Sequence, residues 1–173
     1  MTSEIVRNII RFFILVLLQV LIVQNIHLGS YIVLLPYLLF ILLLPFETPK
    51  LLLLLVSFIT GLTIDVFYDT AGMHAAACTL MGFARYFLLK FIAPRDGYEQ
   101  GLQPTIDDMG SAWFITYSAV LIFIHHLFFF YLEVFRWDEF FRTFGRIILS
   151  SVGTFIFVFV IQFLFYNISR ARR

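Results

Sequence analysis

The chain has 173 residues, of which 61% are hydrophobic and only 13% are charged, whereas globular proteins are about half apolar and about a quarter charged. This composition indicates an integral membrane protein, and the length is that of a single domain covering residues 1–173. The formal net charge of +1 excludes a nucleic-acid-binding function, which requires a clustered basic excess. The single cysteine, Cys78, excludes an intrachain disulfide and a thiolate metal site.

Apolar runs long enough to cross about 30 Å of hydrocarbon as helices recur along the chain. The six predicted spans are residues 9–26, 31–46, 51–68, 71–93, 112–132 and 147–166. The second span is short and contains Pro36, which removes a helical hydrogen bond, so we expect a kink or a packed irregularity there. The expected fold class is therefore an all-α integral membrane protein with about six transmembrane helices.

The first apolar run follows Arg7 and Arg11, as in a signal peptide, but no small-x-small cleavage site comes after it. We therefore interpret it as a retained helix. With six spans both termini lie on the same side, and nine of the twelve lysines and arginines fall on that side. The positive-inside rule then predicts that both termini are cytoplasmic.

A polar loop at residues 94–111 contains the sequence "TIDD", in which Thr105 and Asp108 have the spacing of a capping box. We expect Thr105 to be the N-cap and Asp108 to be the N3 residue at the start of the fifth span. Capping is also the interpretation that we give to the acidic residues of this loop.

The stretch from residue 133 to residue 146 has aromatic residues at helical spacing, among them Trp137, Phe141 and Phe144. Charged residues fall between them, a pattern typical of an amphipathic helix that lies in the membrane interface. The aromatic residues are predicted to anchor this helix in the interface. A partner-binding surface is the alternative interpretation.

Asp65 and Asp69 in "GLTIDVFYD" lie four residues apart and therefore on one helix face. Ionisable groups at membrane depth are costly and usually face a bundle interior or water, which makes them functional candidates. Asp69 is expected to lie past the membrane edge, in the turn "YDTAG". Asp65 is one helical turn deeper, roughly 6 Å by the helical rise, and we expect it to contact His74 in a structural role.

Two enzyme classes use carboxylates in comparable positions. Gly61, Asp65 and Asp69 match the tail of the metal-binding signature of CDP-alcohol phosphatidyltransferases, which needs further aspartates to hold divalent metal. Leu44 and Glu47 occupy those positions here, so most of the upstream half is missing. An intramembrane aspartyl protease needs a second carboxylate facing the first, and no other span offers one in its apolar stretch. We predict that the chain is not an enzyme and uses no metal or cofactor.

Three further polar residues lie inside predicted spans. His125 and His126 are adjacent, and their side chains point about 100° apart on a helix, so they do not converge on one ion. We expect one of them in the core and the other at the lipid interface. Arg85 lies too deep in the fourth span to reach the membrane surface comfortably. It is expected to face the bundle interior, although the sequence names no partner for it.

The stretch "GLTIDVFYDTAGMHAAACTLMGFARYFLLKFIAPRDGYE" resembles the family of the rod shape-determining protein MreD. That family has a similar length, five or six spans, a G-L-x-x-D motif near the end of one helix and G-x-[NH]-A at the start of the next. The corresponding residues here are Gly61, Leu62, Asp65, Gly72, His74 and Ala75, and Arg85 and "PRDGYE" are similar to one variant of the family.

The resemblance implies a non-enzymatic scaffold subunit of the bacterial elongation (rod) complex in the cytoplasmic (inner) membrane, with a role in peptidoglycan synthesis and cell shape. The implied partners are the coiled-coil membrane protein MreC and, through it, MreB, RodA and a penicillin-binding transpeptidase. The resemblance also implies a fold similar to the substrate-binding subunit of energy-coupling-factor transporters. A vitamin-type transporter subunit is therefore the alternative function. We prefer the scaffold because few polar side chains lie inside the spans.

Within this interpretation, Asp65 fixes the turn between the third and fourth spans together with His74 and the backbone of Gly72. The turn is expected to shape a contact surface that faces outward. Trp137, Phe141 and Phe144 are expected to form a second surface along the membrane.

Overall fold

The computed structural model describes residues 2–26, 32–99, 101–134 and 140–171. Its α-helices are α1 (Thr2–Leu17), α2 (Leu38–Leu42), α3 (Lys50–Tyr68), α4 (Met73–Phe91), α5 (Ile106–Met109), α6 (Ser111–Val134) and α7 (Phe140–Ala171). A π-helical turn (Leu18–Ile22) and a 3₁₀ turn (Val23–Asn25) prolong α1. The described ranges contain no β-strand, so the expected all-α class is confirmed for them.

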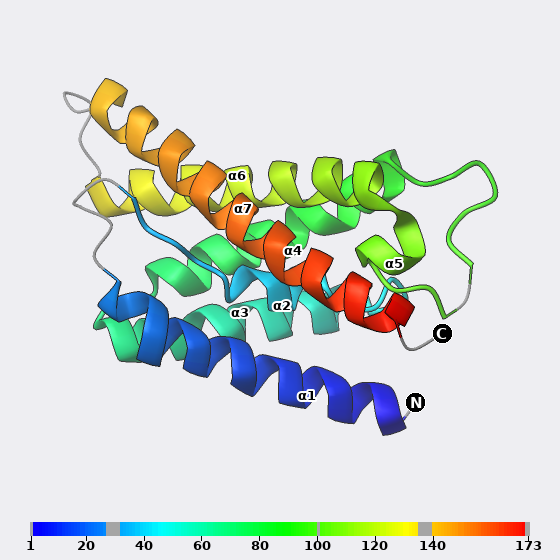
Figure 1. Cartoon of the computed structure of the whole chain (residues 1–173). Coiled ribbons are helices and arrows are strands. Elements are labelled where there is room, and N and C mark those ends of the chain that lie inside the picture. Colours follow the sequence, from blue (N-terminus) through cyan, green and yellow to red (C-terminus); the bar gives the residue numbers. More distant parts are fainter. Residues whose placement is uncertain (1, 27–31, 100, 135–139, 172–173) are drawn as a thin grey trace.

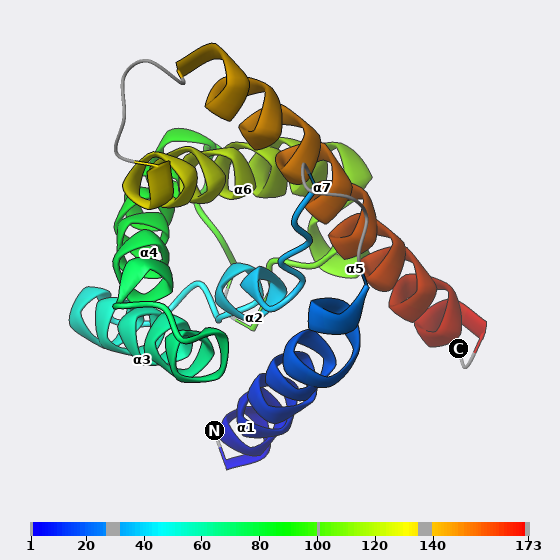
Figure 2. The same ribbon diagram turned by 90° about the vertical axis from the view of Figure 1, so that its left-hand side faces the viewer.

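The long helices form a bundle around the short helix α2. The helix α3 packs on α4, α4 on α6, and α6 on α7, while α1 lies beside α2 and α3. Viewed along the bundle, α2 lies inside the ring that the long helices make (Figure 2). The start of α1, the end of α7 and α5 lie at the same end of the bundle (Figure 1). We call this the α5 end, and we call the opposite end, where α3 turns into α4, the turn end.

Four of the described helical stretches are long and apolar enough to cross a membrane, and the chain is a membrane-spanning protein. They are Glu4–Asn25, Lys50–Tyr68, Ser111–Val134 and Phe140–Leu164. These stretches correspond to the predicted first, third, fifth and sixth spans. The predicted fourth span is α4, which has 19 residues but a more polar composition. It packs between α3 and α6, so much of its surface contacts protein rather than lipid.

The predicted second span, residues 31–46, is not a transmembrane helix. Helical structure in it is limited to the five residues of α2, and the described residues before α2 are irregular or form a turn. The stretch from Leu35 to Leu44 is nevertheless almost completely buried, with each apolar side chain at most 5% exposed. Non-helical backbone is tolerated at membrane depth where protein surrounds it, and Pro36 supplies no backbone N–H. We call residues 32–46 the inner segment.

The predicted capping box at Thr105 and Asp108 differs from expectation. Thr105 does accept a hydrogen bond from the Asp108 N–H (3.3 Å), but it caps the four-residue helix α5, and Gly110 with φ of 81° separates α5 from α6. The Asp108 carboxylate accepts from the Gln103 N–H (2.7 Å) rather than from Thr105. Only the Thr105 half of the capping box is therefore formed, and it begins a short helix ahead of the fifth span.

The predicted interfacial helix at residues 133–146 is divided between two elements. Residues 140–146 form the first turns of α7 and continue into the sixth span without a break, because no helix-breaking proline intervenes. Arg146 is paired with Glu133 near the end of α6 (3.0 Å), which joins the two helices at the turn end. Trp137 lies outside the described residues.

Candidate functional site

Asp65, in the last turn of α3, binds the first turn of α4. Its Oδ1 accepts a hydrogen bond from the His74 N–H (3.0 Å), and its Oδ2 accepts one from the Ala75 N–H (2.8 Å). The Thr70 hydroxyl also donates to Oδ1 (2.5 Å). The first N–H groups of a helix lack intrahelical partners and carry partial positive charge, so the carboxylate stabilises this end of α4. The expected contact between Asp65 and His74 is therefore present, but it is made to the His74 backbone.

Gly61 allows α3 and α4 to approach closely one turn before Asp65. A Cβ atom at Gly61 would lie 2.3 Å from the His74 carbonyl oxygen and 2.5 Å from the Ala75 Cα. The turn between the helices has two left-handed residues, Asp69 with φ of 53° and Gly72 with φ of 83°. Glycine adopts this conformation without steric cost. The glycines of the motif thus have two distinct roles, one in helix packing and one in the turn.

Tyr37, in the inner segment, joins three side chains from α4 and α6. Its hydroxyl contacts His74 Nδ1 (2.9 Å) and His125 Nε2 (3.2 Å), and the Cys78 thiol donates to it (3.6 Å). All four side chains are at most 1% exposed. Because a phenol has one proton to donate, one of the two histidines must accept from Tyr37 while the other donates. This cluster fixes the inner segment to the turn-end half of α4.

His126 belongs to a separate contact. Its Nδ1 bonds the Ile122 carbonyl (2.9 Å) and its Nε2 contacts the Thr154 hydroxyl (3.2 Å). Both His125 and His126 are completely buried. The expectation that one of them faces lipid is therefore wrong, because both sides of this part of α6 are covered by protein. Their separate partners agree with the expectation that they do not converge on one ion.

The backbone of the inner segment is bonded by hydroxyl and amide side chains from the surrounding helices. Ser150 accepts from the Val33 N–H (3.0 Å), and Thr154 accepts from the Leu35 N–H (3.1 Å). Gln19, in the π-helical turn after α1, donates to the Leu34 carbonyl (3.2 Å). A backbone group without a hydrogen-bond partner costs several kcal/mol in a membrane interior, because no water is present to bond it. These side chains therefore supply the partners that an unbroken helix would have provided itself.

Arg85 bonds the other end of the inner segment. Its Nε donates to the Tyr117 hydroxyl (2.6 Å) and its Nη2 donates to the Leu44 carbonyl. The Tyr117 hydroxyl in turn donates to the Leu42 carbonyl (2.8 Å). Arg85 is 1% exposed, as expected for a side chain that faces the interior. No ion pair joins it to a carboxylate in the part of the chain that the structure describes.

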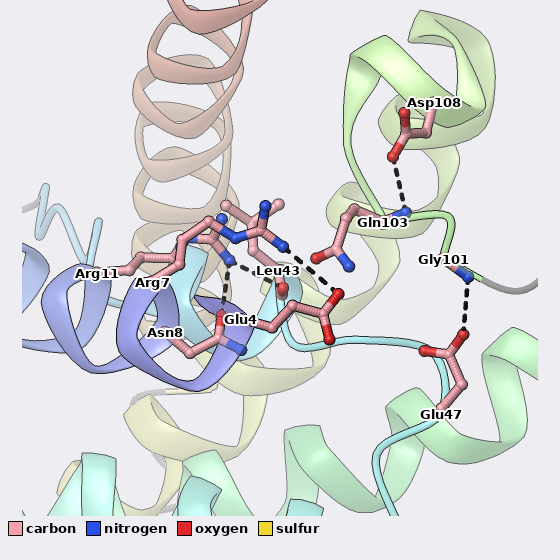
Figure 3. A network of polar contacts seen from close by, with 9 residues as sticks. All are labelled: Glu4, Arg7, Asn8, Arg11, Leu43, Glu47, Gly101, Gln103 and Asp108. Carbon is pink, nitrogen blue, oxygen red and sulfur yellow. Dashed lines mark hydrogen bonds and ion pairs between the residues drawn. The ribbon is translucent and has the colours of Figure 1, made fainter. Parts of the chain in front are cut away.

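The aromatic side chains of Phe46 and Tyr98 pack together at the α5 end. The Tyr98 ring stacks on Phe46, with 4.1 Å between ring centroids, and its hydroxyl donates to the Leu89 carbonyl (3.0 Å). Burial raises the pKa of Tyr98, which keeps this hydroxyl protonated as a donor. Nearby, the Glu47 carboxylate accepts from the Gly101 N–H (3.3 Å), as Figure 3 shows. The loop before α5 is thereby attached to the end of the inner segment.

The structure separates the predicted site residues into an internal and an external group. Gly61, Asp65 and His74 meet at the turn end, whereas Arg85 lies nearer the α5 end of α4. All four residues are buried, so none of them is available at the surface. The external group consists of Phe141, which is 89% exposed, and Phe144, which is 40% exposed.

Sequence reasoning missed the residues that hold the inner segment. They are Gln19, Tyr37, Tyr117, Ser150 and Thr154. A signal for them was present, because a short apolar stretch with a proline implies backbone groups that other spans must satisfy. Hydroxyl and amide side chains inside the neighbouring spans were the candidates for that role.

Within the described ranges, no three His, Cys, Asp or Glu side chains are grouped so that they could hold a metal ion. Comparison of the chain with protein-family models, with curated proteins and with solved structures finds no match in any of the three.

Proposed function

We propose that the chain is a non-enzymatic scaffold subunit of the bacterial cell-elongation (rod) complex, as its resemblance to the MreD family implies. In this proposal it lies in the bacterial cytoplasmic membrane with both termini in the cytoplasm. The observation that carries the proposal is the use of the buried polar side chains. Asp65, Thr154 and Tyr117 bond the backbone of the chain itself, at the start of α4 and along the inner segment. The buried cluster around Tyr37 bonds side chains of the chain itself.

This use of polar groups favours a structural role over catalysis. Asp65, the carboxylate at membrane depth, has both oxygens occupied by backbone N–H groups and the Thr70 hydroxyl. A general acid or base must reach the proton of a substrate within hydrogen-bond distance, and Asp65 is only 3% exposed. A carboxylate held in this way orders a turn instead.

The transporter subunit remains the second candidate, and the inner segment argues against it. A solute site between helices needs convergent polar groups around an open space. Here the centre of the bundle is filled by α2, whose five side chains are at most 5% exposed. Around it, Ser150, Thr154 and Tyr117 bond the backbone of the inner segment, and the cluster at Tyr37 is completely buried. We therefore prefer the scaffold.

Partner contacts in the proposed complex must use exposed side chains, and the turn end offers several. Phe141 is 89% exposed at the start of α7, and Val66 is 74% exposed near the end of α3. The positive-inside rule places this end outside the cytoplasm, and the implied partner MreC has its coiled coil on that side. We propose that the first turn of α7 forms part of the contact with an MreC-like protein.

The test is to cross-link the tagged protein in its native membrane, purify it in mild detergent and identify its companions by mass spectrometry. We expect an MreC-like coiled-coil protein together with RodA and a penicillin-binding transpeptidase. Recovery of ATPases with a coupling membrane subunit would instead establish the transporter.

A matched pair of variants locates the contact. Phe141→Ala is expected to reduce recovery of the MreC-like protein several-fold, because a large apolar side chain is removed from the proposed interface. Phe91→Ala is the control, since Phe91 is also 89% exposed but lies at the α5 end of α4. Equal recovery with both variants would remove the first turn of α7 from the interface.

A further inference from the structure

A pocket of about 510 Å³ opens between α1, α2, α5 and α7 at the α5 end. Its upper rim is polar and includes Arg7, Arg11, Gln103 and Asp108. Farther from the α5 end its lining is mostly apolar and includes Ile14 and Ile161, with Gln162 as a buried polar residue beside them. Pockets of about 300 to 1,000 Å³ are of the size that holds small ligands. The pocket thus combines a charged mouth with an apolar interior.

The two charged walls of the mouth have opposite sign. Arg7 and Arg11 lie on successive turns of α1. Arg7 is 4.0 Å from the Glu4 carboxylate, and the Nη1 atom of Arg11 donates to Asn8 (3.2 Å) and to the Leu43 carbonyl (3.0 Å). A guanidinium has five N–H donors, so Arg11 is held in place and retains donors for an anion. On the facing wall, the Asp108 carboxylate is fixed by the Gln103 N–H (2.7 Å).

Gln103 provides an independent indication of a ligand. Its side chain is only 9% exposed, yet its Oε1 atom has no hydrogen-bond partner. Figure 3 shows this side chain extending from the loop toward α1, on the side where the guanidinium groups of Arg7 and Arg11 lie. A buried polar atom without a partner costs about 1 to 3 kcal/mol. An amide oxygen accepts hydrogen bonds only, so the missing partner is a donor.

The pocket extends along α1 from its charged mouth toward the middle of the helix. Arg7 and Ile14 both line it, and seven residues of helix correspond to about 10 Å along the axis. The α1 stretch belongs to a helix that is apolar and long enough to cross the membrane. The arginines therefore lie at the depth of lipid headgroups, and the apolar walls lie at the depth of acyl chains.

From these observations we propose that the pocket binds a phospholipid with a phosphoethanolamine headgroup. Its phosphate contacts Arg7 and Arg11, its ammonium group donates to Gln103 Oε1 on the wall that Asp108 makes negative, and an acyl chain lies along the apolar walls. Arginine is well suited to phosphate because its planar fork of donors matches the phosphate oxygens. This proposal does not depend on the scaffold function.

The test is a titration of the purified protein with phosphatidylethanolamine and phosphatidylcholine of identical acyl chains, followed by native mass spectrometry. Both lipids have a phosphate and a positive charge, but the trimethylammonium of phosphatidylcholine has no N–H to donate. We expect phosphatidylethanolamine to bind about tenfold more tightly, the effect of one charge-assisted hydrogen bond. Equal binding of the two lipids would overturn the proposal.

Variants test recognition of the ammonium group and of the phosphate separately. Gln103→Leu is expected to abolish the preference for phosphatidylethanolamine, and Gln103→Glu, which keeps an acceptor, is expected to retain it. Arg7→Gln is expected to weaken both lipids several-fold, whereas Arg95→Gln, at an exposed loop position outside the pocket, is expected to change neither. A preference that persists in Gln103→Leu would contradict the assignment.

Soluble O-phosphoethanolamine distinguishes a lipid from a free headgroup. Without acyl chains it should not displace the bound lipid at an equal concentration, because the apolar walls contribute most of the contact area. Displacement at that concentration would show that the pocket recognises a soluble phosphate compound, and it would overturn the lipid proposal.

Discussion

Asp65 and Arg85 carry opposite charges within one bundle, but each is bound by uncharged groups of the chain rather than by the other. Asp65 lies beside the first turn of α4, where backbone N–H groups favour an anion. Arg85 is eleven residues after His74, roughly 16 Å farther along the helix, where it donates to Tyr117 and to the Leu44 carbonyl. The bonded backbone groups thus take the place of counter-ions.

At Asp65, removing the carboxylate should destabilise the fold. We expect Asp65→Ala to lower the free energy of unfolding by about 3 kcal/mol, because it removes a helix cap and leaves two buried N–H groups unpaired. Asp65→Asn, which retains one acceptor oxygen, should lose less. The measurement is unfolding in detergent followed by circular dichroism. Asp69→Asn is the control, since Asp69 is exposed and asparagine tolerates its left-handed conformation. Equal stability of Asp65→Ala and the unchanged protein would contradict this role.

At the scale of elements, the long helices were predictable from apolar runs. For the inner segment the sequence predicted a packed irregularity at Pro36, which the structure contains, but not the loss of most of the helix. The predicted span 51–68 is α3, and the predicted span 112–132 lies within α6. Hydropathy reports that a stretch is removed from water, and it does not distinguish burial in lipid from burial in protein. The apolar residues from Leu35 to Leu44 are surrounded by protein, so the composition of this stretch resembled that of a membrane helix.

The same distinction explains which site residues could be found. Asp65 stood out because a carboxylate at membrane depth is costly and rare. Hydroxyl groups such as those of Ser150 and Thr154 are inexpensive at that depth when they bond a nearby backbone group. Their partners here are far away in sequence, as in the bond from Leu35 to Thr154. The tertiary arrangement, which no local pattern encodes, was needed to identify them.

The inner segment should depend on the hydroxyl of Thr154. Thr154→Val keeps the shape of the side chain but removes the partner of the Leu35 N–H and of His126, so we expect a loss of about 2 kcal/mol in unfolding free energy. Thr154→Ser should restore most of it. Thr63→Val is the matched control, because the Thr63 hydroxyl bonds only a carbonyl of its own helix, that of Ile59. A loss as large in Thr63→Val would mean that the inner segment does not need this bond.

For the whole molecule, the inner segment accounts for the path of the chain. A helix over residues 31–46 would rise only about 24 Å, less than the roughly 30 Å of the hydrocarbon core. Extended backbone advances about 3.3 Å per residue, so a segment that is only partly helical reaches farther. The inner segment runs back along the bundle (Figure 1), and Glu47 after it contacts Gly101 at the α5 end. The described chain therefore returns to the α5 end before α3 begins.

This path predicts which positions share a side of the membrane. Single cysteines at Glu47 and Asp96, both exposed near the α5 end, should be protected from a membrane-impermeant maleimide in intact bacterial cells, whereas a cysteine at Ala71, exposed at the turn end, should be labelled. All three should react after lysis. The unchanged chain is the control, because its own Cys78 is buried. Labelling of both Glu47→Cys and Ala71→Cys in intact cells would mean that the inner segment does not cross the membrane. Labelling of Asp96→Cys in intact cells would contradict the proposed cytoplasmic location of the termini.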